Sequence, residues 1–318
     1  MKATALCVTV GLFLAACFLC SAKEGGSIVQ LSPEFAKLVS PDAKIELLAS
    51  GFQFLEGPVW HRDGFLLFSD THKEAIFKYD PTTGKTSVYR PVPGNSNGLT
   101  FDLQGRLITV EYGKHRLTRL EKDGTVTELV SSYQGKRLNT TNDVVVKSDG
   151  SIYFSDPPYG VAKEARELNF QGVYRLGTDG TLTLLIDDFE FPNGLAFSPN
   201  EKTLYIDDSG PRMHIRAFDV KPDGTITNGR LFSDLKSAER GAPDGMKVDT
   251  KGNVWSTGPG GVWVFDKNGK HLGTIKPPEV PANCAWGDKD GKTLYMTAQT
   301  GLYRIRTNAQ GIRPWIKR

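Results

Sequence analysis

The chain has 318 residues, of which 39% are hydrophobic and 24% charged, so it is long enough to bury a sizeable core in one or two domains. Its 39 basic and 36 acidic residues give a net charge of +3, which is too balanced to indicate nucleic acid or an anionic membrane as a partner. The 34 glycines and 18 prolines indicate many turns, and hence many short strands.

The first 22 residues differ in composition from the rest. Lys2 is followed by an apolar run from Ala3 to Leu19 and then by small residues, which predicts a secretory signal peptide cleaved after Ala22. The tetrapeptide LAAC, which ends at Cys17, indicates an alternative: a bacterial lipoprotein held on a membrane through Cys17. An uncleaved anchor is less favoured, because the apolar run is barely long enough to span a bilayer. We therefore expect an exported protein, in the bacterial periplasm if the signal is cleaved.

Residues 23–43 are expected to form an N-terminal segment, with a short helical turn within residues 32–39, and residues 44–318 to form the main domain. Once residues 1–22 are removed, Cys284 is the remaining cysteine, so no internal disulfide can form. We expect Cys284 to be a small buried apolar residue.

Six segments of the main domain can be aligned with one another. Each contains an apolar strand, a Gly- or Asp-rich turn and a second apolar strand, and the segments begin roughly 40–50 residues apart. They start at Glu56, Asn97, Asn142, Asn193, Asp244 and Asn283. Hairpins such as RLTRLEKDGTVTELV lie between them. Four strands in each of six repeats predict an all-β, six-bladed β-propeller, whereas a β-sandwich would not require six equal units. The segment KIELLAS, residues 44–50, is expected to complete the last blade beside the C-terminal strands.

The first residues of the six repeats all carry a side-chain oxygen. Because the innermost strands of a propeller line its axis, we expect these six residues to form one ring. Two are acidic and four are amides, which suits a calcium-like cation, and no His or Cys cluster competes for a softer metal at this place. Asn and Asp are also frequent in turns, but a turn preference does not explain Glu56. The sequence therefore predicts a central metal site.

These motifs resemble the gluconolactonase/regucalcin (senescence marker protein) family of six-bladed calcium propellers, and the bacterial gluconolactonases most closely. The resemblance covers nearly all of the chain after the signal. It rests on EGPVW at 56–60, RLNTTNDVVVKSDGSIYFSDPPYG at 137–160, PNGLAFSP at 192–199, APDGMKVD at 242–249 and GVWVFDKNGKHLGTI at 261–275.

The resemblance implies roles for four ring residues. Glu56, Asn142, Asn193 and Asp244 match the metal ligands of the family; Asn142 also matches a substrate contact, and Asp244 the proton acceptor and donor. Calcium is the expected ion, with magnesium, manganese or zinc as alternatives. The chain departs from the family at Thr140, where animal members have arginine, and at Tyr112, where many bacterial relatives have histidine. The substrate preference therefore does not carry over.

The chemistry expected of such a site is hydrolysis of a sugar lactone, such as gluconolactone. A divalent ion polarises the carbonyl, and Asp244, whose short side chain can reach both ion and water, assists the attack of water. A metal-dependent aryl esterase or organophosphate hydrolase on the same site, and a non-catalytic calcium-binding propeller, remain alternatives.

Substrate contacts are expected from residues on or beside the ring positions. These are Asn97, Tyr112, Asn139, Asn142, Tyr159 and Asn283. The expected partner is a small-molecule lactone, and the chain is expected to be a monomer or a homodimer.

Two other groups of polar residues are less favoured as catalytic residues. His72, His115 and His214 are placed in loops, and nothing in their spacing indicates a catalytic dyad. Aspartates recur at the end of the second strand of a repeat, at positions 70, 156 and 207–208, where we expect them to cap the blade turns.

Overall fold

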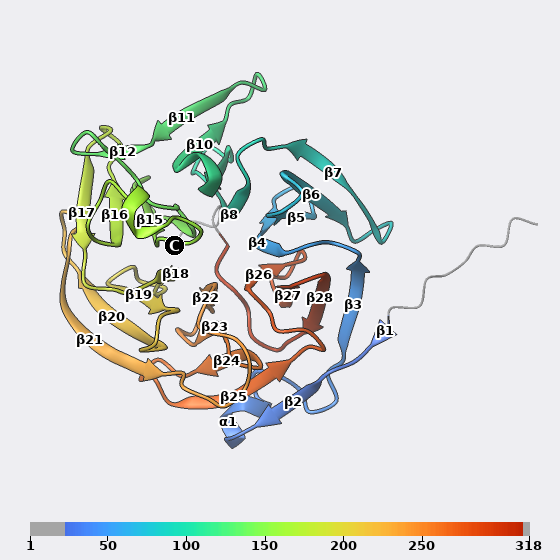
Figure 1. Ribbon diagram of the computed structural model, residues 1–318. Coiled ribbons are helices and arrows are strands. Elements are labelled where there is room, and N and C mark those ends of the chain that lie inside the picture. Colours follow the sequence, from blue (N-terminus) through green and yellow to red (C-terminus); the bar gives the residue numbers. More distant parts are fainter. Residues whose placement is uncertain (1–22, 314–318) are drawn as a thin grey trace, which may run out of the picture.

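The computed structural model describes residues 23–313, so the expected signal peptide, its cleavage after Ala22 and the alternative anchor at Cys17 lie outside the described residues. Six antiparallel sheets of four or five strands surround a central axis, with one additional two-stranded hairpin (Figure 1). The expected all-β, six-bladed propeller is confirmed. Among residues 23–313, no helix is long and apolar enough to cross a membrane.

Blades 1 to 4 each consist of four consecutive strands, counted outward from the axis. Blade 1 contains β4 (Leu55–His61), β5 (Phe65–Asp70), β6 (Ala75–Asp80) and β7 (Lys85–Pro91). Blade 2 contains β8 (Ser96–Phe101), β9 (Leu107–Glu111), β10 (Arg116–Leu120) and β11 (Val126–Val130), with η1 (Tyr112–Lys114) after β9. The separate hairpin of β12 (Ser132–Tyr133) and β13 (Lys136–Arg137) follows.

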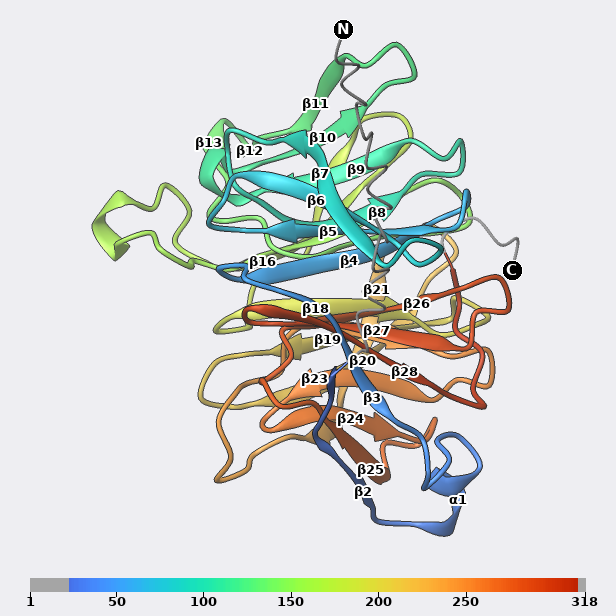
Figure 2. The ribbon, with the colours of Figure 1, turned by 90° about the vertical axis from the view of Figure 1, so that its right-hand side faces the viewer.

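Blade 3 contains β14 (Val144–Val146), β15 (Ile152–Asp156), β16 (Gly172–Leu176) and β17 (Leu182–Ile186). The connection from β15 to β16 includes η2 (Lys163–Ala165) and projects from one face of the molecule (Figure 2). Blade 4 contains β18 (Pro192–Phe197), β19 (Thr203–Asp208), β20 (His214–Val220) and β21 (Ile226–Asp234).

Blades 5 and 6 combine the two ends of the chain. Blade 5 contains β22 (Met246–Val248), β23 (Val254–Gly258), β24 (Gly261–Phe265) and β25 (His271–Lys276), with β2 (Ser27–Gln30) added outside β25. Blade 6 contains β26 (Asn283–Gly287), β27 (Thr293–Ala298) and β28 (Gly301–Arg306), followed by β3 (Ile45–Ser50) and β1 (Lys23–Glu24).

The pairing of β3 with β28 confirms that residues 44–50 complete the last blade. The helical turn expected within residues 32–39 is α1 (Pro33–Ala36), whose Phe35 is buried in the core between blades 5 and 6. The sequence did not indicate that β2 would extend blade 5. Through β1 and β2 the N-terminal segment belongs to two blades instead of standing apart from them.

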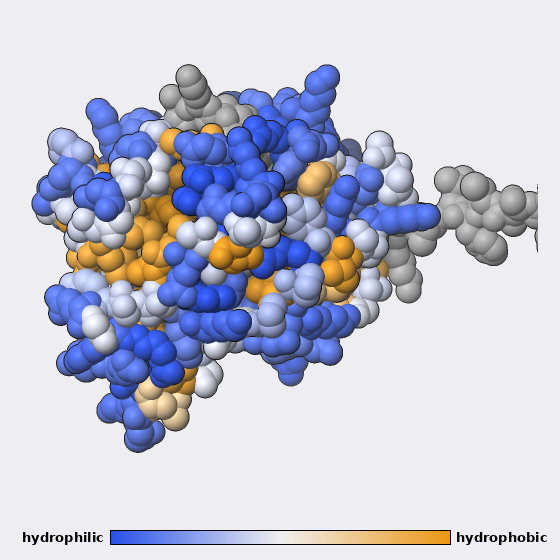
Figure 3. Space-filling view, turned by 90° about the horizontal axis from the view of Figure 1, so that it is seen from above, coloured by the Kyte–Doolittle hydropathy of each residue, from blue (hydrophilic) through white to orange (hydrophobic). Residues whose placement is uncertain are grey.

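Burial falls from the axis outward. The innermost strands β8, β18 and β26 are buried throughout, whereas the outermost strands β7 and β11 are largely exposed. Inner strands are covered on both faces by neighbouring blades, so that even their polar residues, such as Ser96 and Thr100 of β8, are buried. The face of the molecule seen in Figure 3 is mostly hydrophilic, with separate hydrophobic patches.

Six buried clusters, one between each pair of neighbouring blades, hold the ring together. Between blades 1 and 6, Trp60 stacks on Tyr295 with ring centroids 5.5 Å apart. Between blades 5 and 6, Trp255 and Trp286 meet edge to face at 4.9 Å. Such large aromatic residues bury much apolar area at once. The expected burial of Cys284 is confirmed, because it lies in this same cluster.

Candidate functional site

Five of the six ring residues face one cavity of about 500 Å³ at one end of the axis. Glu56, Asn97, Asn142, Asn193 and Asp244 line it. Each lies at the start of an innermost strand or just before it. The alignment of the repeats therefore predicted correctly which residues would meet at the axis.

Glycines after the ring residues allow this convergence. A Cβ atom on Gly57, which has φ +48°, would lie 2.0 Å from the carbonyl oxygen of Asn97 in the next blade. A Cβ atom on Gly194 would lie equally close to the carbonyl oxygen of Asp244. Only glycine tolerates such close approach, so the "NG" and "DG" pairs serve ring packing as well as turn geometry.

The Glu56 carboxylate is fixed by two hydrogen bonds to one of its oxygens. The Gly57 N–H donates to Oε2 over 2.9 Å, and Asn283 Nδ2 donates to the same oxygen over 3.1 Å. A break in register between Glu56 and Val59 turns the strand at this point. Both recorded bonds go to Oε2, which leaves Oε1 for a ligand in the cavity.

The Asn193 amide is oriented by its donor side. Nδ2 donates to Ser209 Oγ over 2.9 Å and to the Tyr159 hydroxyl over 3.4 Å, and Ser209 Oγ in turn donates to the carbonyl oxygen of Pro243. The acceptor Oδ1 is buried without a partner in the described chain. An unsatisfied buried acceptor is costly, and a cation at the axis would satisfy it.

The two ring carboxylates lie in a poorly hydrated place and repel each other. Burial raises the pKa of Glu56 to about 7; the Gly57 N–H opposes this rise and the charge of Asp143 adds to it. Burial, and then the charge of Glu56, raise the pKa of Asp244 well above its usual range. A cation between them would relieve both effects.

The donor set fits a hard cation. Within residues 23–313 no three His, Cys, Asp or Glu side chains gather to hold a metal, so an ion at the axis would need the asparagine oxygens as well as Glu56 and Asp244. Mixed carboxylate and amide oxygens are what calcium takes. The unpartnered Oδ1 of Asn193 is the observation that favours this fit.

Three of the expected substrate contacts line the wall of the cavity beside Asn142: Asn97, Tyr112 and Tyr159. Tyr112 donates its hydroxyl to the carbonyl oxygen of Thr71 over 3.2 Å. Burial and the nearby Asp244 charge raise the pKa of Tyr159, so its phenol stays protonated.

The structure does not bring Asn139 or Asn283 to the cavity wall. Asn139 is buried, with Nδ2 donating to the carbonyl oxygens of Asp156 and Phe170. Asn283 is buried beside the ring and donates to Glu56. Both amides are used inside the fold, and Asn283 acts on the site through Glu56.

The cavity wall also contains Phe54, Thr71, His72, Thr140 and Gly160, which were not predicted as site residues. They come from connections between strands, where no periodic pattern marks them. Thr140 had been noted only as a departure from the family.

The three histidines considered have different surroundings. His72 is an exposed residue of the cavity wall, and its ring lies 6.0 Å from that of Phe54. His115 contacts the carbonyl oxygen of Asn139. His214 was expected in a loop, but it lies in β20, where its ring stacks on Phe189.

The recurring aspartates cap the entry to the innermost strands, as expected, with one exception. Asp70 and Asp208 each accept backbone N–H groups from the loop before that strand, at Phe54 and Phe191 for example. Asp156 accepts from the Asn139 N–H. Asp207 differs: it accepts from the Gly194 N–H at the axis, because adjacent residues of a strand point to opposite faces.

Comparison with known proteins gives a consistent result. Residues 54–300 match the family described as SMP-30/Gluconolactonase/LRE-like region. The chain belongs to this family.

A gluconolactonase from Zymomonas mobilis is 33% identical over 315 residues, covering 90% of this chain and 87% of that protein. Pentonolactonase XacC from Haloferax volcanii is 29% identical, covering 77% of this chain and 81% of that protein. Among solved structures, a gluconolactonase from Xanthomonas campestris superposes with a TM-score of 0.82 at 33% identity, covering 91% of this chain and 99% of that one.

Proposed function

We propose that the protein is a metal-dependent lactonase that hydrolyses a sugar lactone of the gluconolactone type. The observation that carries the proposal is the single cavity on which Glu56, Asn142, Asn193 and Asp244 converge. The 33% identity with a gluconolactonase over 90% of the chain supports the substrate class.

The charge of the cavity favours a neutral substrate. Among residues 23–313 its lining contains no lysine or arginine, whereas its floor, formed by Glu56, Asn142, Asn193 and Asp244, has two carboxylates. A phosphorylated sugar lactone would meet negative charge without a basic partner. A volume of about 500 Å³ accommodates a monosaccharide lactone, and the rings of Phe54, Tyr112 and Tyr159 offer apolar surface along the wall.

The residues of the floor divide the chemistry between them. Glu56, Asn142, Asn193 and Asp244 would hold a divalent cation, most simply calcium, and when bound this ion would supply positive charge to polarise the lactone carbonyl. Asp244 takes a proton from the attacking water as the water oxygen bonds to the carbonyl carbon. The bond between that carbon and the ring oxygen then breaks. Asp244 returns the proton to the departing ring oxygen, which gives the open-chain hydroxy acid.

Neighbouring groups keep this arrangement in place. Asn283 and the Gly57 N–H fix the Glu56 carboxylate, and Ser209 fixes the Asn193 amide. The protonated Tyr159 phenol accepts from Asn193 Nδ2 at the cavity wall, and we propose that it donates a hydrogen bond to a substrate oxygen.

The test is acid release from D-glucono-1,5-lactone above the spontaneous rate, measured with EDTA, without it, and after calcium is added back. We expect EDTA to abolish the catalysed rate and calcium to restore it. The 6-phosphate of the same lactone should be a poor substrate. Metal-independent turnover would contradict the mechanism. Preference for an aryl ester would favour the esterase alternative, and calcium binding without turnover of either substrate would favour a non-catalytic propeller.

We further propose that the chain is exported and that its mature form begins at Lys23. The support is the sequence pattern of residues 1–22. Intact mass measured after expression with the full N-terminus should show loss of these 22 residues and recovery in the periplasmic fraction. A lipid-modified N-terminus at Cys17 would replace this proposal by membrane anchoring.

A further inference from the structure

The axis continues beyond the floor of the cavity as a narrow apolar channel of about 60 Å³. The same six innermost strands line it with residues two or three positions farther along, such as Val59, Leu99 and Leu195. Most of these side chains are hydrocarbon, so this level of the axis is stabilised by packing.

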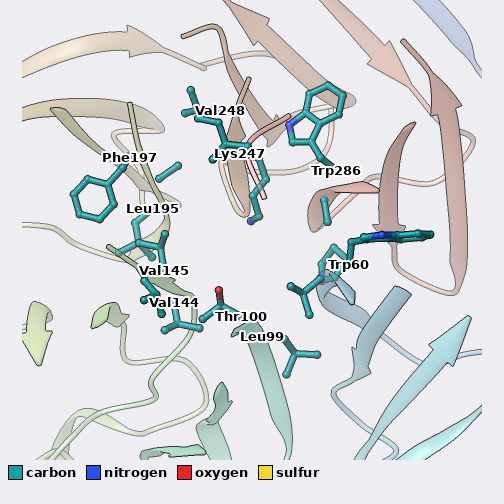
Figure 4. Close-up of a pocket in the computed structure, with 16 residues that line it drawn as sticks. Trp60, Leu99, Thr100, Val144, Val145, Leu195, Phe197, Lys247, Val248 and Trp286 are labelled. Atoms are coloured by element: carbon teal, nitrogen blue, oxygen red, sulfur yellow. The ribbon is translucent and has the colours of Figure 1, made fainter. Parts of the chain in front are cut away.

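One position of the repeat carries a charge in blade 5 and in no other blade. Three residues after the ring residue, blade 5 has Lys247. The other five repeats have Val59, Thr100, Val145, Ala196 and Trp286 at this position. All six residues line the channel, and Figure 4 shows Lys247 reaching from β22 toward its middle. Lys247 therefore departs from the packing pattern of the repeat.

The Lys247 ammonium group is bound at the level of the ring, not left in the channel. Its Nζ donates to the carbonyl oxygen of Met246 over 2.9 Å and to the side-chain Oδ1 of Asn283 over 3.3 Å. These bonds offset part of the cost of placing an ammonium group among apolar residues. The second of them connects the channel to a ring residue.

The buried amide of Asn283 is fixed in one orientation by blade 5 and by its own backbone. Its Oδ1 accepts from Lys247 and, over 2.8 Å, from the N–H of Cys284. A Cβ atom on Gly245 would lie 2.0 Å from Asn283 Cγ, so the amide occupies the space that this glycine leaves. With Oδ1 bound on this side, Nδ2 is left to donate elsewhere.

Asn283 Nδ2 donates to Glu56 Oε2 over 3.1 Å, beside the N–H of Gly57 at 2.9 Å. In the flipped amide, Oδ1 would face the Glu56 carboxylate and Nδ2 would face the Lys247 ammonium, so both contacts would become repulsive. Lys247 therefore favours the one orientation in which Asn283 supports Glu56.

We propose that Lys247 is a positioning residue of the metal site, which acts through Asn283 on Glu56. By holding Asn283 it keeps both donors on Oε2 and leaves Oε1 of Glu56 for the ion. This inference rests on the cation site of the proposed function. It implies that a positive side chain strengthens the binding of a cation, because the placement of Glu56 outweighs the repulsion between like charges.

The test is a double-mutant cycle on calcium affinity, measured by calorimetry for the wild type, K247M, N283A and K247M/N283A. Methionine suits the apolar channel and removes both the charge and the donor. We expect K247M to weaken calcium binding by about tenfold, as loss of a group that orients a ligand commonly does. N283A should weaken it at least as much, and the double variant should bind no more weakly than N283A.

Thr100→Val is the matched control, because Thr100 occupies the position of Lys247 in the second repeat and lines the same channel without a charge. It should bind calcium with wild-type affinity. In lactone hydrolysis, K247M should need more calcium for half-maximal rate, while kcat at saturating calcium should match that of the wild type. A lower kcat with an unchanged calcium requirement would contradict a positioning role.

Three results of the calcium titration would overturn the proposal. Tighter binding by K247M than by the wild type would show that the ammonium acts on the ion only by repulsion. Unchanged affinity would show that it does not act on the site. Additive losses in K247M and N283A would show that Lys247 acts by a route other than Asn283.

A wild type that binds no calcium would contradict the metal site of the proposed function. The same four proteins, melted in EDTA, then decide the contact itself. If Lys247 holds Asn283, the Tm of the double variant should exceed the value obtained by adding the two single shifts. Additive shifts would overturn the hold of Lys247 on Asn283.

Discussion

The floor of the cavity and the channel behind it are built by the same six strands, yet they differ in chemistry. At the first position of five of the six repeats the strands present side-chain oxygens to a cavity of about 500 Å³. Two or three residues farther on they present valine, leucine and tryptophan to a channel of about 60 Å³. The repeat therefore fixes where side chains meet, and the residue type at each level decides whether they bind or pack.

Among the substitutions that test this difference between floor and channel, Asp244→Asn should have the largest effect. It keeps the shape of the floor but removes the proposed proton acceptor, so lactone hydrolysis should fall by about 10³-fold or more. The Tm in EDTA should not fall, because the substitution removes a buried carboxylate that Glu56 repels. Steady-state kinetics and thermal melts check this, and near-normal kcat would exclude Asp244 as the base.

Glu56→Gln should weaken metal binding rather than the fold. Both recorded hydrogen bonds to Glu56 reach one oxygen, and an amide oxygen can accept them. The lost negative charge should reduce calcium affinity by at least about tenfold. Calcium titration by calorimetry measures this. Wild-type affinity would mean that Glu56 is not a ligand.

Val59→Ala, three residues farther along the same strand, is the counterpart in the channel. Val59 is buried and packs between blades 1 and 2, so its truncation should lower the free energy of unfolding by about 1–3 kcal/mol. Calcium affinity and kcat should stay at wild-type values in folded protein. If either changed as much as in Glu56→Gln, the two levels of the axis would not be separable.

Asp156→Asn should have the smallest effect, visible as a change in pH dependence. Burial raises the pKa of Asp156 to about 8, against about 4 in an unfolded chain. Its stabilising contribution is therefore complete below pH about 4 and is lost as the pH rises through about 8. The variant should lose about 2–4 °C less in Tm than the wild type between pH 6 and 9. Parallel profiles would show that Asp156 does not titrate in this range.

The sequence predicted the parts that the repeat dictates. It identified the six blades, the strand at 44–50 that closes the ring and seven of the residues that line the cavity, namely five ring residues, Tyr112 and Tyr159. It could not predict the role of Asn283, which occupies a ring position but turns its amide to Glu56. That orientation depends on two partners of Oδ1, the N–H of Cys284 and Lys247, and neither belongs to the shared pattern.

The sequence did not indicate the loop residues Phe54, Thr71 and His72 for a different reason. Phe54, Thr71 and His72 reach the cavity from connections whose path is set by packing against neighbouring blades, not by strand periodicity. Asn139 was expected at the substrate because it lies three residues before Asn142, but its amide is bound by the carbonyl oxygens of Asp156 and Phe170.

The seam of blade 6 determines when the site can exist during synthesis. β3 pairs with β28, and Asn283 reaches Glu56 across 227 residues of sequence. A ribosome must therefore release almost the whole chain before the first and last repeats can meet, and contacts of such long range form slowly. Until that moment the cavity lacks one wall, so the nascent protein has no complete site for the proposed cation.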